Sequence, residues 1–431
     1  MTQVIDIRLP GKDAPVTVGR LALADDDNPT GSMAFRYDEA WLADGFALGE
    51  DLPLTPGVLS PIADQDETDP VLFARSGRFG FCADHAPGKW VPRLLEQARL
   101  NGLKIDFCDL APVQTVLWAH AGHVSGRFSA LLLPITHSNQ STFSPPRIDE
   151  QPSGKVGKDL KNLASALEAL AAGASFRGTE LLETLLAGAC ELGGSTPKCV
   201  VRLGRDKGDW VVRHSSVREP FRRSLWTAVT RQMAQECGLS VVEGRLIAPR
   251  LYAERRFDRL DDGTSLLCLS AASLVRRMKT GERVLRPSPM SYLDIADILN
   301  RAGARPACDL KELFGRLLFN TLTGNNRDRL DQFWFTATPL GWKLLPMYCP
   351  CAQPAVLSTR TLSTPIRPGV NAADPEAALA VSRYFGVSPK AAKAMRLEFM
   401  HTLSNWKRAA QECGADLPEI RRMQSVFEQD Q

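Results

Sequence analysis

The spacing of apolar and polar residues predicts β-structure in the first part of the chain. Residues 4–9 and 33–37 alternate between apolar and polar side chains, and residues 16–23 are typical of a further strand. Alternation with a period of two is the pattern of a strand with one buried face. Helical spacing follows at residues 91–103, and residues 129–135 form a short apolar run typical of a strand. The pattern predicts a β-rich N-terminal region.

A segment rich in Ser, Thr and Pro, residues 136–155, is predicted to be a linker or surface loop. After it, a helix that ends at Gly173 is predicted by four leucines at helical spacing: Leu160, Leu163, Leu167 and Leu170. A strand, a turn and a second strand are expected over residues 198–213. A helix over residues 222–237 and a strand over residues 247–252 complete this mixed region.

The C-terminal part of the chain is predicted to be mainly helical. Apolar positions recur at helical spacing in residues 292–301, 309–322, 375–385 and 390–413. A mixed region followed by a helical region is the pattern of a two-lobed α+β enzyme.

The composition is that of an ordinary globular protein. Of the 431 residues, 44% are hydrophobic and 23% are charged, and the net charge of +3 is too small to indicate nucleic-acid binding by itself. Residues 201–260 lean basic, with 13 Lys or Arg against 7 Asp or Glu. This excess is typical of a solvated basic face and leaves a phosphate-binding surface as the second interpretation.

The cysteines and the N-terminus predict a cytoplasmic protein. The ten cysteines are scattered, and no pair of CxxC motifs has zinc-ribbon spacing, so we interpret them as free thiols in a reducing compartment. The N-terminus lacks the apolar core of a signal peptide, and no apolar run approaches the roughly 20 residues of a membrane span. His120 and His123 are a weaker candidate pair of metal ligands, with no third ligand in view.

Several short strings occur in an order that resembles the HipA family of bacterial serine/threonine kinases, the toxin components of toxin–antitoxin pairs. The most diagnostic is Arg256-Phe257-Asp258-Arg259, which is similar to that family's ERFDR element. Gly193 and Gly194 open a loop that ends at Lys198, where the family carries a glycine loop ending in lysine. Further strings match in the same order, at residues 18–21, 35–38, 52–54, 79–84, 291–292, 319–326 and 406–410.

The resemblance spans nearly the whole chain and implies a two-lobed, protein-kinase-like α+β fold. It implies a β-rich, HipA-like N-terminal subdomain over residues 1–135 and a linker over residues 136–156. A mixed, kinase-like N-lobe with the glycine loop is then expected over residues 157–265. An all-α C-lobe with the catalytic loop is expected over residues 266–431.

Phosphoryl transfer requires a cation on the nucleotide phosphates, oxygen ligands for Mg²⁺, and a base that orients the attacking hydroxyl. The resemblance implies a phosphate-anchoring lysine at the position of Arg213. Arginine keeps the positive charge but offers a broad planar fork instead of a compact ammonium. Arg213 is therefore either a phosphate contact or a structural arginine. Residues 226–228, where the acidic partner of that lysine is expected, contain no carboxylate.

The catalytic loop departs from the family's G-x-x-D-x-H-x-x-N-F pattern at three positions. Residues 324–333 have Arg327 at the catalytic aspartate, Arg329 at the histidine and Gln332 at the metal-binding asparagine. The guanidinium of Arg327 stays protonated at neutral pH and cannot act as a base. Asp328 is the candidate substitute base. Asp331 is expected to be a solvated loop acid or a partner for one of the two arginines.

Two further positions differ from the family pattern. Cys349 stands where an L-x-P-x-Y-D element has the second metal-binding aspartate, and a thiol is a soft ligand that suits Mg²⁺ poorly. We interpret Cys349 as a small buried residue. Glu191 precedes the glycine loop where the family has serines, and its negative charge would disfavour phosphates nearby.

These replacements predict a HipA-like pseudokinase that binds no metal and needs no cofactor, and that acts through protein binding. The alternative is an active HipA-family kinase toxin that uses ATP and Mg²⁺ with rearranged acids, namely Asp328, Asp331 or Asp258. The resemblance also implies a HipB-like helix-turn-helix antitoxin as a partner and, through it, operator DNA. The sequence leaves the oligomeric state open.

Overall fold

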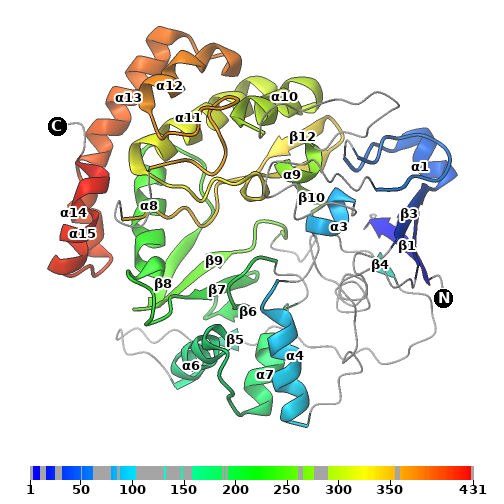
Figure 1. Ribbon diagram of the computed structural model, residues 1–431, viewed down its shortest axis with the longest axis horizontal. Helices are drawn as coiled ribbons and strands as arrows, with labels where there is room; N and C mark the ends of the chain where they lie inside the picture. The colour runs from blue at the N-terminus through cyan, green and yellow to red at the C-terminus, as the bar shows by residue number, and fades with distance from the viewer. Residues whose placement is uncertain are drawn as a thin grey trace. The chain divides into compact units, whose positions relative to one another are not determined.

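The computed structural model describes residues 3–9, 16–24, 32–49, 51–61, 79–84, 88–102, 131–132, 147–148, 158–186, 189, 193–260, 266–275, 290–354 and 360–428. The chain divides into two compact units, whose labelled elements are drawn in Figure 1. The first unit comprises Met1–His214, Asp258–Leu269 and Arg276–Arg283. The second unit comprises Ser215–Phe257, Ser270–Val275 and Val284–Gln431. The domain boundaries expected from the sequence stay predictions.

A four-stranded antiparallel sheet forms the N-terminal part of the first unit. Its strands lie in the order β3 (Ser32–Tyr37), β2 (Val16–Ala24), β1 (Gln3–Leu9) and β4 (Leu131–Leu132). In β3, Phe35 and Tyr37 are buried while Arg36 between them is exposed, as the alternating pattern predicts. Helix α1 (Glu39–Asp44) begins after Asp38, whose carboxylate accepts the N–H of Ala40 at 3.0 Å and caps the helix.

A second group of elements in the first unit carries the glycine loop. Strand β5 (Arg147–Ile148) pairs in parallel with β6 (Lys198–Leu203), which pairs antiparallel with β7 (Trp210–His214). The helices of this unit are α3 (Gly80–Asp84), α4 (Val91–Leu100), α6 (Lys158–Ala172) and α7 (Thr179–Leu186). The four leucines that predict α6 are all buried, so its apolar stripe packs inward.

The second unit contains one helix and two hairpins in its mixed part. Helix α8 (Arg223–Glu236) precedes the antiparallel pair β8 (Gly244–Ala248) and β9 (Leu251–Arg255). The second hairpin is formed by β11 (Trp334–Thr338) and β12 (Gly341–Leu344). The short strand β10 (Cys268–Ser270), whose first two residues belong to the first unit, leads directly into α9 (Ala271–Leu274) of the second unit.

Helices make up most of the remainder of the second unit, and α11 lies among them (Figure 1). They are α10 (Tyr292–Ala302), α11 (Pro306–Thr323), α12 (Pro375–Ala380), α13 (Pro389–Leu403), α14 (Trp406–Glu412) and α15 (Leu417–Phe427), with 3₁₀ turns η2 (Leu330–Gln332) and η3 (Ser382–Phe385). Helix α11 is buried along most of its length because α10, α12, α13 and α15 pack around it. Among the described helices, none is both long and apolar enough to cross a membrane.

Three aromatic rings join α8 to the C-terminal helices. The ring centroid of Trp226 lies 6.3 Å from that of Trp406 and 6.4 Å from that of Phe427, and the latter two rings stack at 5.0 Å. Beside them, the guanidinium of Arg222 donates to both carboxylate oxygens of Glu419, with an Nε–Oε1 distance of 2.7 Å. Ring stacking and a two-point ion pair therefore fix α14 and α15 against the start of α8.

Most predicted elements are present, and three predictions are wrong in their boundaries. The helix expected over residues 375–385 ends at Ala380, and the 3₁₀ turn η3 follows it. The strand expected over residues 247–252 is two strands, because Pro249 and Arg250 form the turn between β8 and β9. Proline lacks the N–H that a continuous strand needs. The helix expected over residues 390–413 is broken between α13 and α14 at Ser404 and Asn405. The β11–β12 hairpin and α15 were not predicted.

Replacing Trp406 with alanine is expected to destabilise the second unit by about 3–5 kcal/mol, because the variant loses a buried ring that contacts two others. Leu417→Ala on α15 is the control, since that side chain is 65% exposed and its loss should change stability by less than about 0.5 kcal/mol. Chemical denaturation followed by far-UV circular dichroism measures both changes. Similar midpoints for the two variants would contradict the assignment of this cluster to the core.

Candidate functional site

The candidate catalytic loop, residues 324–333, begins where α11 ends. Gly324 has a φ of 60°, a left-handed conformation that favours glycine and terminates the helix. The next residue, Asn325, is buried, and its Oδ1 accepts the N–H of Arg327 at 3.3 Å and the N–H of Cys351 at 3.0 Å. One amide side chain thus ties the start of the loop to the segment that follows β12.

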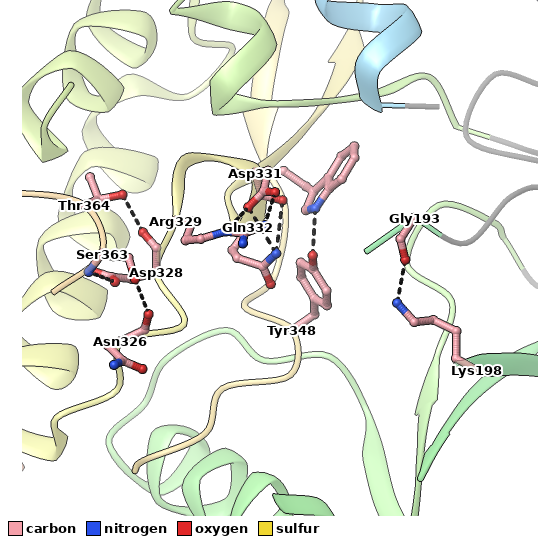
Figure 2. A network of polar contacts seen from close by, with 11 residues as sticks. Gly193, Lys198, Asn326, Asp328, Arg329, Asp331, Gln332, Tyr348, Ser363 and Thr364 are labelled. Carbon is pink, nitrogen blue, oxygen red and sulfur yellow. Dashed lines mark hydrogen bonds and ion pairs between the residues drawn. The ribbon is translucent and has the colours of Figure 1, made fainter. Parts of the chain in front are cut away.

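Asp328, the candidate substitute base, is buried within this loop. Its Oδ1 accepts the backbone N–H of Ser363 at 2.7 Å, and its Oδ2 accepts the hydroxyl of Tyr292 at 3.0 Å. Its carbonyl oxygen accepts the hydroxyl of Thr364 at 2.6 Å. Figure 2 shows Asp328 turned toward Ser363 and Thr364. Both oxygens of the carboxylate are therefore engaged by groups of the protein.

A chain of side-chain hydrogen bonds continues from Asp328 between α10 and α11. Nδ2 of Asn320 donates a hydrogen bond to the Tyr292 hydroxyl at 2.9 Å. Nδ2 of Asn325 donates a hydrogen bond to Oδ1 of Asn320 at 2.8 Å. All four side chains are buried. Buried polar groups are costly unless they are bonded, so a fully bonded chain favours one arrangement of the loop over others.

Burial changes the acid–base behaviour of this network. Burial raises the pKa of the Asp328 carboxyl from 3.8 to about 7, although the hydrogen bonds from Ser363 and Tyr292 act in the opposite direction. Burial also raises the pKa of the Tyr292 hydroxyl, and the nearby charge of Asp328 adds to that rise. The Asp328 carboxyl therefore titrates near neutral pH while it remains out of contact with solvent.

Asp331 forms a separate cluster with its loop neighbours (Figure 2). The guanidinium of Arg329 donates to both carboxylate oxygens of Asp331, with an Nε–Oδ1 distance of 3.0 Å. Nε2 of Gln332 donates to the same Oδ1 at 3.3 Å. The prediction that Asp331 pairs with one of the loop arginines is confirmed for Arg329.

Arg327 puts a positive charge where the resemblance implies the catalytic aspartate. Its side chain is partly exposed and lies within electrostatic reach of the Glu219 carboxylate and the Cys351 thiol, both of whose pKa values it lowers against the larger effect of burial. Position 327 thus has a positive charge, whereas an aspartate that accepts a proton from a hydroxyl has a negative charge.

Cys349, at the second predicted metal position, is buried in a left-handed conformation with a φ of 48°. Asn and Asp adopt this conformation more readily than other non-glycine residues. Its backbone N–H donates to Oε1 of Glu254 at 2.6 Å. The preceding Tyr348 contacts the ring of Phe257 at 5.3 Å and accepts the indole N–H of Trp334 at 3.2 Å, so the backbone around Cys349 is firmly held.

The donor set at the two predicted metal positions suits Mg²⁺ poorly. Gln332 directs its amide nitrogen toward Asp331, and Cys349 offers a soft thiol. Mg²⁺ prefers hard oxygen ligands, usually with one or two carboxylates. Within the described ranges of the chain, no three His, Cys, Asp or Glu side chains gather in a way that could hold a metal ion.

In the first unit, strand register brings together two of the candidate phosphate-binding residues. Lys198 of β6 lies directly opposite Arg213 of β7, and residues opposite each other in an antiparallel pair share a face. Nζ of Lys198 donates to the carbonyl oxygen of Gly193 at 2.6 Å, as Figure 2 shows. Gly194 has a φ of 89°, and its carbonyl oxygen accepts the N–H of Lys89 at 2.9 Å. The glycine loop therefore folds back over the lysine, and two cations share one side of the hairpin.

The last two residues of the ERFDR-like string, Asp258 and Arg259, have a structural role within the first unit. Arg259 pairs with Asp209 at 3.1 Å, and Asp209 also accepts Nε of Arg202 at 3.3 Å. Asp258 is buried, and its carbonyl oxygen accepts the N–H of Leu266 at 2.8 Å. The string thereby braces the turn that joins β6 to β7.

Sequence reasoning missed Glu254 and Glu219. Glu254 follows the buried residues 251–253 in β9, and an acid that continues a buried run is the signal that could have identified it. Glu219 has no comparable signal, because it lies among exposed loop residues before α8. Several sequence-based predictions fall outside the described residues: the histidines His120 and His123, Glu191, and the linker over 136–156 apart from Arg147–Ile148, which form strand β5. The roles given to the other candidate residues stay predictions.

Asp328→Asn should weaken the pH dependence of folding. Because the pKa of Asp328 rises from 3.8 to about 7, the folded protein binds this proton more tightly than the unfolded chain does. The resulting stability is fully present below pH 3.8 and falls by about 1.4 kcal/mol per pH unit as the pH rises toward 7. Denaturation midpoints between about pH 4 and pH 7 should therefore fall more steeply in the wild type than in the variant.

Asp297→Asn, at an exposed position of α10, is the matched control for removing one carboxylate. It should keep the wild-type pH slope. If Asp328→Asn also keeps that slope, Asp328 does not titrate in the window given above.

Comparison with known proteins gives the chain its family. The sequence profile of the HipA-like C-terminal domain matches residues 190–427. A solved structure of the Shewanella oneidensis MR-1 toxin–antitoxin system, with HipA, HipB and operator DNA, includes a chain with 14% sequence identity and a TM-score of 0.60. That match covers 100% of this chain and 95% of the other, and it confirms the expected HipA-like α+β fold.

A second solved structure, the proinflammatory kinase CtkA of Helicobacter pylori, aligns with 53% of this chain and 90% of its own, at 12% identity and a TM-score of 0.35. A TM-score of 0.35 does not indicate a shared fold. No curated protein sequence matches the chain. The profile covers more than half of the chain, which therefore belongs to the HipA-like C-terminal domain family.

Proposed function

We propose that this HipA-family chain is a pseudokinase, which acts by binding a protein partner and does not transfer phosphate by the Mg-ATP route. One observation carries the proposal: both acids of the candidate catalytic loop are engaged by neighbouring groups of the protein. Asp328 accepts hydrogen bonds from Ser363 and Tyr292, and Asp331 is paired with Arg329. A base must be able to reach the hydroxyl that it deprotonates.

The charge of the loop supports the same conclusion. Arg327 and Arg329 bring two permanent cations into a segment where the family pattern has an aspartate and a histidine. Neither guanidinium accepts a proton at neutral pH. With Gln332 and Cys349 at the metal positions, the loop would have to stabilise phosphoryl transfer without its usual carboxylate ligands. We infer that the chain uses neither Mg²⁺ nor ATP as a cofactor.

One observation favours the alternative of an active kinase. A general base works best when its pKa is near the working pH, and burial raises the pKa of Asp328 to about 7. To serve as a base, Asp328 would have to leave Ser363 and Tyr292 and reach a substrate hydroxyl. This would break the buried hydrogen-bond chain that runs to Asn320 and Asn325.

The purified chain, incubated with labelled ATP and Mg²⁺, is expected to transfer no phosphate to itself or to proteins of a cell lysate. Its thermal shift with ATP should be the same with and without Mg²⁺, because the metal positions lack hard oxygen ligands. Autoradiography and thermal-shift assays measure the two results. Phosphate transfer that persists in Asp331→Asn and disappears in a correctly folded Asp328→Asn would replace this proposal with the alternative.

The partner that we propose is a small HipB-like helix-turn-helix protein, and through it operator DNA. The support is the full-length likeness to the Shewanella oneidensis HipA chain, which was solved with HipB and operator DNA. The net charge of this chain is small, so we favour DNA binding through the partner over direct DNA binding by this chain. We propose a cytoplasmic location, which agrees with the free thiols of the described cysteines.

Co-expression with a small helix-turn-helix protein encoded beside this chain is expected to give a complex that elutes as one peak in size-exclusion chromatography. The complex should shift the DNA upstream of the gene pair in a gel assay, and this chain alone should not. A neighbour that elutes separately from this chain would contradict the proposed partner without affecting the proposed loss of catalysis.

A further inference from the structure

Two donors from different parts of the first unit hold the glycine loop, residues 193–198. Nζ of Lys198 donates to the carbonyl oxygen of Gly193 at 2.6 Å (Figure 2), and the backbone N–H of Lys89 donates to that of Gly194 at 2.9 Å. Lys198 belongs to β6, into which the loop leads, whereas Lys89 lies just before α4 in the N-terminal part of the chain. The carbonyl oxygens of both glycines are therefore held, one by each segment.

The segment before α4 lies very close to the loop at Gly88. A Cβ atom at position 88 would lie 2.8 Å from the carbonyl oxygen of Gly194 and 2.3 Å from Nε1 of Trp90. Distances below 3.0 Å are too short for a Cβ contact, so this close approach requires glycine. On its other side, a Cβ atom at Gly194 would lie 3.0 Å from Nζ of Lys198. Gly194 therefore contacts both segments.

Lys89 is part of a defined turn at residues 88–91. The N–H of Val91 donates to the carbonyl oxygen of Gly88 at 2.9 Å and closes the turn. Trp90 has a φ of −87° and a ψ of −17°, which are close to the values of the third residue in a type I turn. Trp90 and Val91 are both buried, and α4 begins at Val91. The turn therefore presents the N–H of Lys89 from a fixed position.

The other end of α4 is fixed separately. Nδ2 of Asn101 donates to the carbonyl oxygen of Phe176 at 3.2 Å, and the N–H of Phe176 donates to Oε1 of Gln97 at 3.3 Å. Helix α4 also packs against α7. By contrast, Gly194 and Ser195 of the glycine loop are exposed. The helix and its turn are therefore the fixed side of the contact, and the loop is the side that can move.

We propose that the turn at residues 88–91 is a latch that holds the glycine loop closed over Lys198. The two held carbonyl groups belong to consecutive residues, so releasing Gly194 from the turn also loosens Gly193 from the lysine. The bond from the turn joins two exposed residues, Lys89 and Gly194, and water can replace either partner. Such a bond contributes only modestly to net stability, so the latch opens locally without unfolding the unit.

The latch lets a segment of the N-terminal region control the glycine loop. While the loop is closed, a ligand that approaches the ammonium group of Lys198 competes with the carbonyl oxygen of Gly193. The turn thereby regulates how readily Lys198 is reached. The proposal goes beyond the pseudokinase function and does not depend on it, because its contacts all lie within the first unit and none involves the candidate catalytic loop.

Hydrogen–deuterium exchange of the full-length chain, measured by mass spectrometry on the peptide that contains residues 193–198, tests the latch. Lys89→Pro removes the N–H that binds Gly194, and proline is favoured at the second position of a type I turn, so the turn itself should persist. The loop amides should exchange roughly 2- to 10-fold faster, as expected for the loss of one backbone hydrogen bond. Lys89→Ala keeps the N–H and is the matched control, which should exchange as the wild type does.

Lys198→Met removes the other donor and should speed exchange of the same loop amides by a similar factor. Exchange in α6, measured in the same spectra, should stay at its wild-type rate in all three variants, which separates loop opening from general unfolding. If Lys89→Pro fails to fold, Lys198→Met decides the test. Loop exchange that is equally fast in Lys89→Pro and Lys89→Ala overturns the proposal, and so does wild-type loop exchange in Lys198→Met.

Discussion

A buried carboxylate that must be fully hydrogen-bonded organises the second unit around its candidate loop. Asp328 is fixed by Ser363 and Tyr292, and Tyr292 is fixed in turn by Asn320 of α11. Leaving any of these groups unbonded in the interior would cost free energy, so the loop, α10, α11 and the segment near residue 363 are held in one arrangement. Both oxygens of the Asp328 carboxylate are thus committed to the fold, and this commitment is the basis of the proposed loss of catalysis.

Sequence patterns predicted helices and strands best where buried positions recur at a regular helical or alternating spacing. The leucines of α6 and the alternation in β3 are examples, since each side chain's environment depends mainly on its own element. The β8–β9 hairpin was missed because a turn at Pro249 and Arg250 interrupts a run that looks continuous. The break before Trp406 depends on tertiary packing against Trp226 and Phe427, which spacing along one helix does not reveal.

The geometry of the candidate site was not predictable from the sequence, and the roles of its residues stay predictions. The resemblance pointed to Arg327, Asp328 and Gln332 in one short loop and to Cys349 in a separate element. It could not reveal that Asp328 is buried, because burial there depends on Tyr292 and Ser363, which lie far away in sequence. For the same reason, the contact between Glu254 and the backbone of Cys349 became visible only in the folded chain.

The backbone around the predicted metal position is fixed by neighbouring residues and not by the side chain at that position. Cys349 has a left-handed conformation that suits asparagine or aspartate. Glu254 accepts its backbone N–H, and the preceding Tyr348 contacts Phe257 and Trp334. The cysteine side chain does not favour this left-handed conformation, so the surrounding fold must impose it. A change of side chain at position 349 leaves the backbone hydrogen bond to Glu254 in place, whereas rebuilding the turn would disturb the contacts with Glu254 and Trp334. The backbone at position 349 can therefore hold an asparagine or an aspartate as readily as the cysteine that it carries.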